Sequence, residues 1–467
     1  EISLGLVGSE MCIRDRAVPL TLEFVVAIML LIVVIQGVLF MNRNAISLFS
    51  SSGIGDLGLK ANNINTVIAC ELLKGRMDLF HCNYPTTKCF QGDIWKLKNS
   101  IIDYYRTTYN EPPFLILATP PCQGMSSNGM GKMLSDYRKG LRPKMDERNR
   151  LIIPAIDIIQ ALQPEWVILE NVSNMVNTLI YDENNILTNI IDYIKTSLGD
   201  NYFGNPVVVD AVDYGVPQHR KRLITVLTRN QMAKNEFLRK GNLLPDFTHS
   251  ESDSFSTHHW VTLREAIGDL PPLRAEKHKN ISPGFSGLHK VPILDEKKLF
   301  WIDNTPEGDT AFNNQCINPQ CGYKGNKTHG TTHNKGGINQ SNIDTPLYCC
   351  RCGSLLPRPW VEDKITKEKR LMKGFVSAYK RMRWDEPAST LTQNFQYACS
   401  DNKLHPSQSR VLSLYEGLIL QSITNYSFSF CINGKKCTDG LIRDTIGESV
   451  PPHIIDLICA HILEFPD

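Results

Sequence analysis

The sequence lacks a strong charge of either sign, a disulfide framework and any long hydrophobic run after residue 41. A net charge of +2 excludes nucleic-acid binding through overall charge, so any such surface must be a local basic patch. Fourteen cysteines in 467 residues do not make a small disulfide scaffold, and their scatter suits a reducing compartment. The 42% hydrophobic and 21% charged residues indicate a globular protein with room for two or three domains.

Residues 1–40 differ from the rest of the chain. Residues 1–16 have no clear period and resemble translated adapter sequence. Residues 24–41 are an apolar run at the short end for a membrane span, without the features of a cleaved signal peptide. Because this run lies so close to the next predicted strand, we expect residues 1–40 to be non-native or dispensable. A membrane anchor is the alternative.

One stretch presents a cysteine as a nucleophile requires. Residues 114–118 are an apolar run typical of a buried strand, and Pro120 and Pro121 cannot extend it because proline has no N–H. Cys122 therefore follows a strand end and precedes a glycine- and serine-rich segment. A thiol in this position is a candidate nucleophile, and a small buried cysteine is the alternative.

From Ala45 onward, strands and helices alternate, which predicts an open parallel sheet. The strands that we expect are residues 45–49, 66–70, 88–93, 114–118 and 166–169. In such sheets ligands bind beyond the carboxyl ends of the strands, and small residues after the first strand let the backbone approach a ligand. We therefore expect one edge of the sheet to hold residues 49–56, Glu71, Asp93, Cys122 and Glu170.

Two further strands are predicted at residues 207–212 and 223–228. The connection between them is too short for a parallel crossover, so the pair should be antiparallel. Gln218, Arg220 and Arg222 alternate along this segment and could share one face, with a solvated basic turn as the alternative.

The middle of the chain lacks this rhythm but contains two cysteine pairs. Cys316 with Cys321, and Cys349 with Cys352, are each followed by glycine, which predicts a four-thiolate zinc ribbon. Such a site is structural because four thiolates leave no open position. Cys350 leaves the register of the second pair open, and chance clustering is the alternative.

Three smaller patterns accompany these pairs. Residues 262–265 form a capping box that should open a short helix. The basic run at residues 364–383 indicates a stripe that contacts phosphates. The single histidines should be loop residues and not metal ligands; they are His249, His258, His259, His278 and His289.

Five motifs, in this order, resemble those of the DNA (cytosine-5) methyltransferase family. They are residues 119–123 (Thr-Pro-Pro-Cys-Gln), 170–172 (Glu-Asn-Val), 218–222 (Gln-His-Arg-Lys-Arg), 383–390 and 447–452. The chain departs from the family pattern at Ser47 for Asp, Ser51 for Gly and Glu448 for Asn. Ser51 should be tolerated if its φ is negative, whereas Glu448 adds a charge near the expected cofactor site.

The resemblance implies an α/β fold. A Rossmann-like S-adenosylmethionine methyltransferase domain, whose parallel sheet has one antiparallel strand, would occupy residues 41–229. A smaller, irregular, β-rich target recognition domain would occupy residues 230–439, with the zinc-binding insert at 316–352. Residues 440–467 would form a C-terminal helix that completes the catalytic domain beside the first strand.

The resemblance also assigns roles to residues. Cys122 would add to C6 of a cytosine flipped out of the duplex, and Glu170 would hydrogen-bond its N3. Arg222 would hold the cytosine O2, and Arg220 would stiffen the loop near Cys122. The positions that match the S-adenosylmethionine site are Phe49, Ser51, Ser52, Gly53, Glu71, Asp93, Ile94, Pro121, Leu151 and Ser449.

These features predict a sequence-specific DNA cytosine-5 methyltransferase of bacterial, archaeal or phage origin. We expect a cytoplasmic monomer that acts on double-stranded DNA and has no membrane partner. A cognate restriction endonuclease is a further candidate partner. A tRNA cytosine-5 methyltransferase is the first alternative, and the large zinc-bearing insert argues against it. An inactive DNA-binding relative is the second, disfavoured because Cys122, Glu170 and both arginines are present.

Overall fold

The computed structural model describes residues 43–121, 146–252, 257–333, 339–341, 344–372 and 376–466. Cys122 and the extension at residues 1–40 lie outside these ranges. Within them, no helix is long and apolar enough to cross a membrane.

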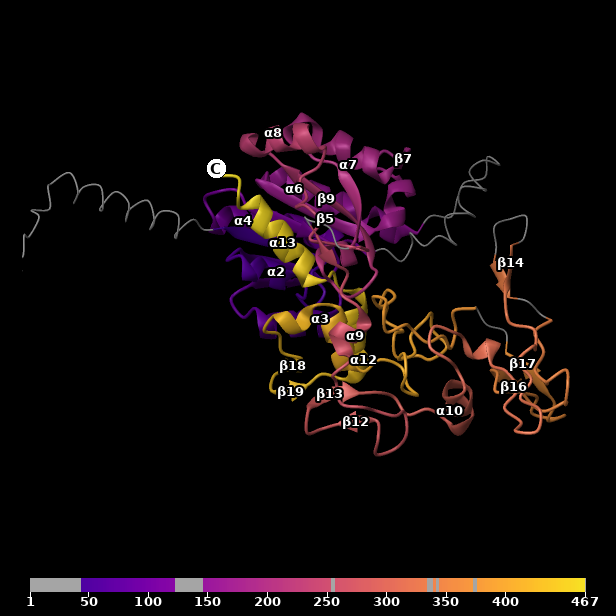
Figure 1. The fold of residues 1–467 in the computed structure, drawn as a ribbon. Helices are drawn as coiled ribbons and strands as arrows, with labels where there is room; N and C mark the ends of the chain where they lie inside the picture. The colour runs from indigo at the N-terminus through magenta and orange to yellow at the C-terminus, as the bar shows by residue number, and fades with distance from the viewer. Residues whose placement is uncertain are drawn as a thin grey trace, which may run out of the picture. The chain divides into compact units, whose positions relative to one another are not determined.

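A seven-stranded sheet forms the centre of the cofactor half (Figure 1). Its strands are β1 (Asn44–Leu48), β2 (Asn65–Glu71), β3 (Lys88–Gln91), β4 (Leu115–Ala118), β5 (Trp166–Val172), β8 (Pro206–Asp210) and β9 (Lys221–Thr228). The order is β3-β2-β1-β4-β5-β9-β8, and β9 is antiparallel to both of its neighbours. The α/β fold with one antiparallel strand is therefore confirmed.

The register of the central strands aligns their carboxyl ends. Leu48 pairs with Cys70 on one side and with Ala118 on the other, and Ala118 pairs with Leu169. Glu71, Thr119 and Glu170 each follow one of these partners directly. Glu71 and Glu170 thus lie at one edge of the sheet, as expected, together with Thr119. Cys122, expected at the same edge, lies outside the described residues.

Helices cover both faces of the sheet. The helices around the sheet are α2 (Asp56–Ala61), α3 (Lys74–Asn83), α4 (Ile94–Thr108), α6 (Ile152–Leu162), α7 (Ile190–Leu198), α8 (Gln231–Lys240) and α13 (Pro452–Ile462). Of these, α8 lies beyond residue 229, the predicted end of the catalytic segment, yet its side chains pack into the core of the sheet. Side chains of α4, α6 and α7 pack with one set of alternating strand residues, and those of α8 and α13 pack with the other set. This alternation follows from the two-residue period of a strand.

The C-terminal helix returns to the start of the domain, as predicted. Asn62, which ends α2, donates to the Asp456 carboxylate of α13 at 2.8 Å. A Cβ at Gly58 would lie 2.5 Å from the Asp456 nitrogen, so the two helices touch through their backbones. Figure 1 shows α13 alongside α2.

The rest of the chain consists of short elements. Its helices are α9 (Leu263–Ile267), α10 (Glu296–Asp303), α11 (Leu414–Leu420) and α12 (Asp439–Glu448). Its strands are β10 (His249–Ser250), β11 (His258–His259), β12 (Ile281–Ser282), β13 (Ser286–Lys290), β14 (Thr331–His333), β15 (Asn339–Ser341), β16 (Trp360–Glu362), β17 (Lys369–Leu371), β18 (Cys431–Ile432) and β19 (Lys435–Lys436). A hairpin of β6 (Leu179–Tyr181) and β7 (Leu187–Asn189) belongs to the cofactor half. The predicted capping box is present, with Thr262 as the N-cap of α9.

Two of the smaller sequence predictions need correction. Four of the five predicted loop histidines lie in strands: His249 in β10, His258 and His259 in β11, and His289 in β13. His289 is fully buried, and its ring nitrogens form hydrogen bonds with the Ser413 hydroxyl and the Pro271 carbonyl. Arg381 does not contact phosphates, because it is buried and donates to the carbonyls of Ile302, Thr305 and His405. A guanidinium satisfies up to five acceptors, which makes it a good clamp for irregular backbone.

Candidate active site and metal centre

Glu71 is held in place at the end of β2. Its two carboxylate oxygens accept hydrogen bonds from the backbone N–H groups of Ser51 (3.0 Å) and Leu73 (2.8 Å), and the side chain is buried. Each carboxylate oxygen can accept a further hydrogen bond. The arrangement therefore suits recognition of a hydroxylated sugar at the end of the second strand.

The loop after β1 adopts a strained backbone. Phe49 has a φ of 59°, Ser51 of 48° and Gly53 of 85°. At Gly53 a Cβ would lie 2.5 Å from Tyr84 and 2.8 Å from Phe80, so only glycine fits. The condition under which Ser51 would be tolerated, a negative φ, is not met. Ser51 therefore carries the cost of a left-handed residue with a side chain.

The other strand-edge residues leave polar atoms and apolar surface for a ligand. Ser51 Oγ and Ser52 Oγ are buried without a hydrogen-bond partner among the described residues. Asp93 caps α4 by accepting from the Trp95 N–H at 3.1 Å. Phe49 and Leu151 are half-buried against the sheet core, whereas Ile94 is buried in it. Unpaired hydroxyls, a carboxylate and apolar walls fit a nucleoside-bearing cofactor such as S-adenosylmethionine.

Ser47, the first departure from the family pattern, contacts a buried acid. Its hydroxyl donates to Asp56 at 3.0 Å, and Thr66 donates to the other oxygen at 3.0 Å. Asp56 is fully buried, and burial raises its pKa from 3.8 to about 6 against the opposing effect of the two hydroxyls. A carboxylate is thus still present beside β1, but on α2.

Glu170 and Arg222 form the polar pair beside the nucleophile strand. Arg222 Nε lies 2.9 Å from Glu170 Oε1, and both side chains are about nine-tenths buried. Burial raises the pKa of Glu170, and Arg222 and then Arg220 partly oppose this effect. A carboxyl group with a raised pKa can remain protonated and donate a hydrogen bond.

The turn that leads to Cys122 is fastened to both neighbouring strands. Asn171 Nδ2 donates to the Pro120 carbonyl at 3.0 Å, and the Thr119 hydroxyl donates to the Phe49 carbonyl at 3.1 Å. Pro121, a predicted cofactor contact, is half-buried at the end of this turn. Sequence reasoning recognised Asn171 as part of a motif but gave it no role, because its carbonyl partner lies on the turn after another strand, β4.

Arg220 makes contacts that the sequence did not reveal. Its guanidinium, 1% exposed, donates to the carbonyls of Leu391 (2.6 Å), Gly447 (3.0 Å) and Ser449 (2.8 Å). It was predicted to stiffen the loop near Cys122, which lies outside the described residues. In the described part Arg220 joins the closing motif to the segment that follows residues 383–390.

Gln218 and Ser449 complete this junction. Gln218 accepts from the Leu391 N–H at 2.7 Å and donates to the Leu420 carbonyl at 2.9 Å. The Ser449 hydroxyl accepts from Gln421 Nε2 at 3.0 Å and donates to the Ile446 carbonyl at 3.0 Å. Gln218 and Arg220 thus share a bracing role, while Arg222 alone of the three faces Glu170.

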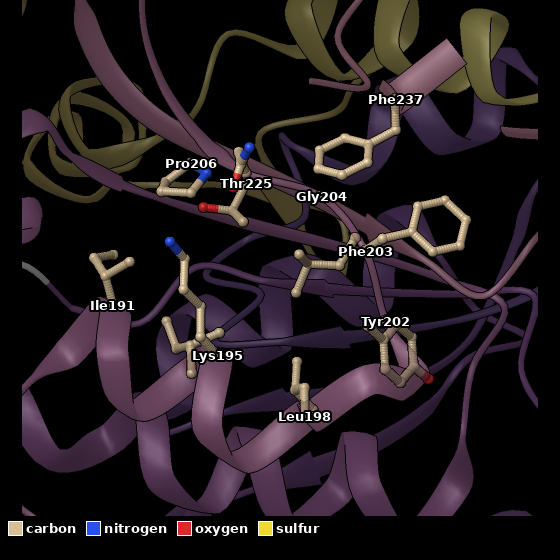
Figure 2. A pocket seen from close by; sticks show the side chains of 13 residues that line it. Ile191, Lys195, Leu198, Tyr202, Phe203, Gly204, Pro206, Thr225 and Phe237 are labelled. Carbon is tan, nitrogen blue, oxygen red and sulfur yellow. The ribbon is translucent and has the colours of Figure 1, made fainter. Parts of the chain in front are cut away.

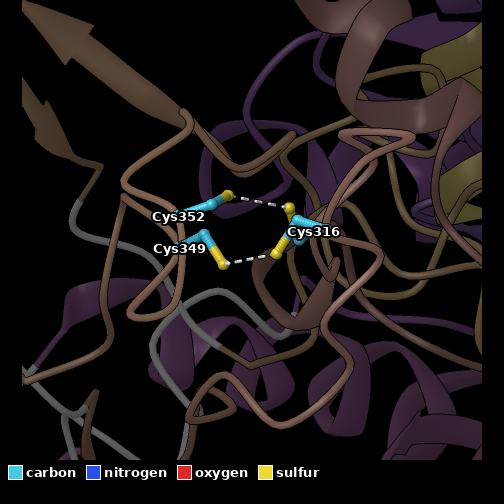
Figure 3. Close-up of side chains that lie close together, drawn as sticks. Cys316, Cys349 and Cys352 are labelled. Carbon is cyan, nitrogen blue, oxygen red and sulfur yellow. Dashed lines mark hydrogen bonds between the residues drawn. The ribbon is translucent and has the colours of Figure 1, made fainter.

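The four predicted zinc ligands come together (Figure 3). Their sulfur atoms all lie within 4.8 Å of one another; Cys316 and Cys352 are 3.6 Å apart, and Cys321 and Cys349 are 3.9 Å apart. The amide of Asn326 also approaches Cys349 Sγ at 3.7 Å. Cys350 is exposed and its backbone N–H donates to Asn326, so the structure resolves the register that the sequence left open. Four converging thiols fit a tetrahedral zinc ion.

A pocket of about 340 Å³ lies elsewhere, between α7, α8, the edge strand β8 and its neighbour β9. Figure 2 shows Leu198, Tyr202 and Phe237 on its walls and Lys195 at its rim. None of the predicted site residues that the structure describes lines it. The pocket is therefore separate from the strand-end edge.

Comparisons with known proteins agree with this arrangement. Residues 43–464 match the sequence profile of the C-5 cytosine-specific DNA methylases. Type II methyltransferase M1.HgaI of Avibacterium volantium is 31% identical over 432 residues, which cover 90% of this chain and 98% of that protein. Type II methyltransferase M.AquIA of Picosynechococcus sp. is 28% identical over 247 residues, 50% of this chain and 90% of the relative.

Among solved structures, Spodoptera frugiperda DNMT2 aligns with a TM-score of 0.48 and 14% identity, over 90% of this chain and 99% of that one. The family profile spans all five motifs and both halves of the junction at Arg220. The chain therefore belongs to the C-5 cytosine-specific DNA methylases: it is an enzyme that methylates cytosine in DNA, and S-adenosylmethionine is the cofactor of its family.

Proposed function

We propose that the enzyme methylates one short DNA sequence through a covalent intermediate between Cys122 and cytosine C6. The Cys122 thiolate adds to C6, and the electron pair of the C5–C6 double bond moves to C5. After C5 has gained the methyl group, a base removes its proton, the double bond re-forms and the thiolate leaves. S-adenosylmethionine, when bound, supplies the methyl group.

The buried Glu170–Arg222 pair is the observation that carries this proposal. In the proposed mechanism Glu170 donates from its protonated carboxyl to cytosine N3, which favours attack at C6. Arg222, 2.9 Å from the same carboxyl, contacts the cytosine O2. The Thr119 and Asn171 hydrogen bonds hold the preceding turn, so the thiol would be presented at the same edge as Glu170.

Replacement of the nucleophile tests the covalent route. Cys122→Ser should lower the rate of methyl transfer at least about a thousandfold, while the variant still binds S-adenosylmethionine. The wild-type enzyme should also form a denaturation-resistant adduct with DNA that contains 5-fluorocytosine, because the C5 proton is then absent. Near-normal activity of the serine variant would refute the mechanism.

Double-stranded DNA is the proposed substrate form, and tRNA is the alternative to be tested. The same enzyme should be incubated with labelled cofactor and either duplex DNA or tRNA. We expect the labelled methyl group to be incorporated into DNA alone. Bisulfite sequencing of that DNA would then identify the recognition site. Equal incorporation into tRNA would reverse the assignment. The type II names of its relatives support a cognate restriction endonuclease as a partner. That the enzyme is a cytoplasmic monomer is a further part of the proposal, on which those names do not bear.

We further propose that Cys316, Cys321, Cys349 and Cys352 bind one structural zinc ion. Their convergence within 4.8 Å supports this, because four cysteine thiolates from two short-spaced pairs are the ligand set of a structural zinc site. The core beside them is small, with Leu356 as its fully buried aliphatic side chain. A metal would therefore contribute much of the folding free energy of this insert.

A further inference from the structure

Glu448, where the closing motif departs from asparagine, has a specific partner. Its carboxylate Oε2 lies 2.6 Å from Nη2 of Arg76, and its other oxygen accepts a hydrogen bond from Gln393 Nε2. The side chains of Arg76 and Glu448 are 18% and 24% exposed. Water therefore screens this pair less than the ion pairs on the surface.

The contact joins three segments that are distant in the sequence. Arg76 lies in the first turn of α3, directly after the strand that ends at Glu71. Glu448 ends α12 and precedes Ser449, while Gln393 follows the segment that Arg220 holds. A Cβ at Gly447 would lie 2.3 Å from the Gln393 nitrogen, so closing motif and bracing segment touch through their backbones. A displacement of Glu448 would therefore shift both the closing motif and the segment around Gln393.

The charges around Glu448 make Arg76 necessary. Burial raises the pKa of Glu448, the Arg76 guanidinium lowers it, and the nearby carboxylates of Asp444 and Glu71 raise it. Glu448 thus adds a negative charge in the neighbourhood of Glu71, the candidate acceptor for the sugar hydroxyls. Without Arg76, Glu448 would be a largely buried carboxylate that has lost its cationic partner, and such a group is displaced or protonated.

We propose that Arg76 is a positioning residue for the cofactor site, which acts by neutralising Glu448 so that Glu71 and Ser449 keep their places. The proposal rests on the proposed cofactor role of those two residues. It makes the need for Arg76 conditional on Glu448: the guanidinium is required only while the carboxylate is present. The carboxylate at this position is then compatible with cofactor binding, although it replaces a neutral amide.

Direct binding measurements on a double-variant cycle test this. S-adenosylmethionine and S-adenosylhomocysteine are each titrated into DNA-free enzyme by isothermal titration calorimetry. The affinity of Arg76→Ala for both should be roughly tenfold weaker than that of the wild type. Glu448→Asn should stay within about threefold of wild type, and the double variant Arg76→Ala/Glu448→Asn should return to that range. Lys74→Ala is the matched control, because Lys74 forms an exposed pair with Asp78 on the same helix.

Two results would overturn the proposal: wild-type affinity in Arg76→Ala, or a double variant as weak as Arg76→Ala alone. At saturating cofactor the kcat of Arg76→Ala should be near normal, since Arg76 acts on KM and not on the reacting atoms. If Arg76→Ala fails to fold, Arg76→Lys, which keeps the charge, should bind within about fivefold of wild type, and a larger loss would refute the charge argument. A wild-type enzyme that does not bind the cofactor would instead refute the proposed function.

Discussion

At the scale of single residues, Ser51 shows how a departure from a family pattern is expressed in the backbone. Its φ of 48° is one that glycine adopts freely and that costs other residues about 1 kcal/mol or more. Its backbone N–H nevertheless donates a hydrogen bond to Glu71, so the strained conformation helps to hold the Glu71 carboxylate in place. The buried Ser51 hydroxyl has no partner among the described residues and therefore does not offset that cost.

Ser51→Gly should stabilise the cofactor-free protein by about 0.5–1 kcal/mol, because relief of the left-handed strain exceeds the added chain entropy. Thermal unfolding compares the variants. Ser52→Gly is the matched control: Ser52 is also buried with an unpaired hydroxyl but is absent from the positive-φ residues. Ser52→Gly should therefore lower the free energy of unfolding. Equal effects of Ser51→Gly and Ser52→Gly would contradict the strain argument.

Asp56 links stability to pH. Its pKa is about 6 in the fold and 3.8 as the ordinary value, so the fold favours the protonated form. The stability that this group contributes is present below pH 3.8 and is lost as pH rises through 6. Relative to Asp56→Asn, which does not titrate, the wild type should lose up to about 3 kcal/mol over this range.

The difference in free energy of unfolding between wild type and Asp56→Asn, measured at several pH values between 4 and 8, checks this. Other titrating groups contribute equally to both proteins and cancel. A difference that stays constant with pH would show that Asp56 is ionised throughout.

At the scale of elements, α13 must approach α2 closely to complete the cofactor half. Gly58→Ala would place a methyl group 2.5 Å from the Asp456 nitrogen and 2.7 Å from the Pro452 carbonyl. Since backbone atoms cannot move aside as a side chain can, we expect a loss of roughly 2–3 kcal/mol in unfolding free energy. Gly75→Ala in α3 is the control, because a Cβ there meets nothing within 4 Å. Equal stability of the two variants would show that α13 docks loosely.

At the scale of the whole molecule, the insert that holds the four cysteines and the seven-stranded sheet have separate cores. The cysteine cluster packs on Leu356, and the neighbouring core is built around Trp301 and Phe312, whereas the sheet has its own clusters. The candidate cofactor residues all lie outside residues 316–352. Loss of the metal should therefore unfold the insert alone.

Cys321→Ser with Cys352→Ser should lower the zinc content from one ion per chain to none and abolish sequence-specific DNA binding. S-adenosylmethionine binding should remain within about threefold of wild type, since the insert adds no predicted contact. Elemental analysis, cofactor titration and DNA binding measure these effects, with Cys350→Ser as a control that changes an exposed cysteine outside the cluster. Concurrent loss of cofactor binding would show that the two parts fold as one.

Local pattern by itself determined much of this protein. Apolar runs, proline positions and the spacing of acids predicted the parallel strands, the antiparallel β9 and the sheet edge that holds Glu71 and Glu170. They could do so because strand period and short connections are local properties. The two cysteine pairs could also be recognised from the sequence, since zinc ligands recur at short spacings. The ordered motifs then identified the chemistry.

Tertiary structure alone decided which partner each polar group has. Arg220 binds the carbonyls of Leu391 and Gly447, and Arg76 meets Glu448, because the fold brings segments hundreds of residues apart into contact. A carbonyl acceptor has no sequence signature, as every residue carries one. The φ of Ser51 was likewise set by the hydrogen bond of its N–H to Glu71 and by the ring of Tyr84 against Gly53, neither of which is local.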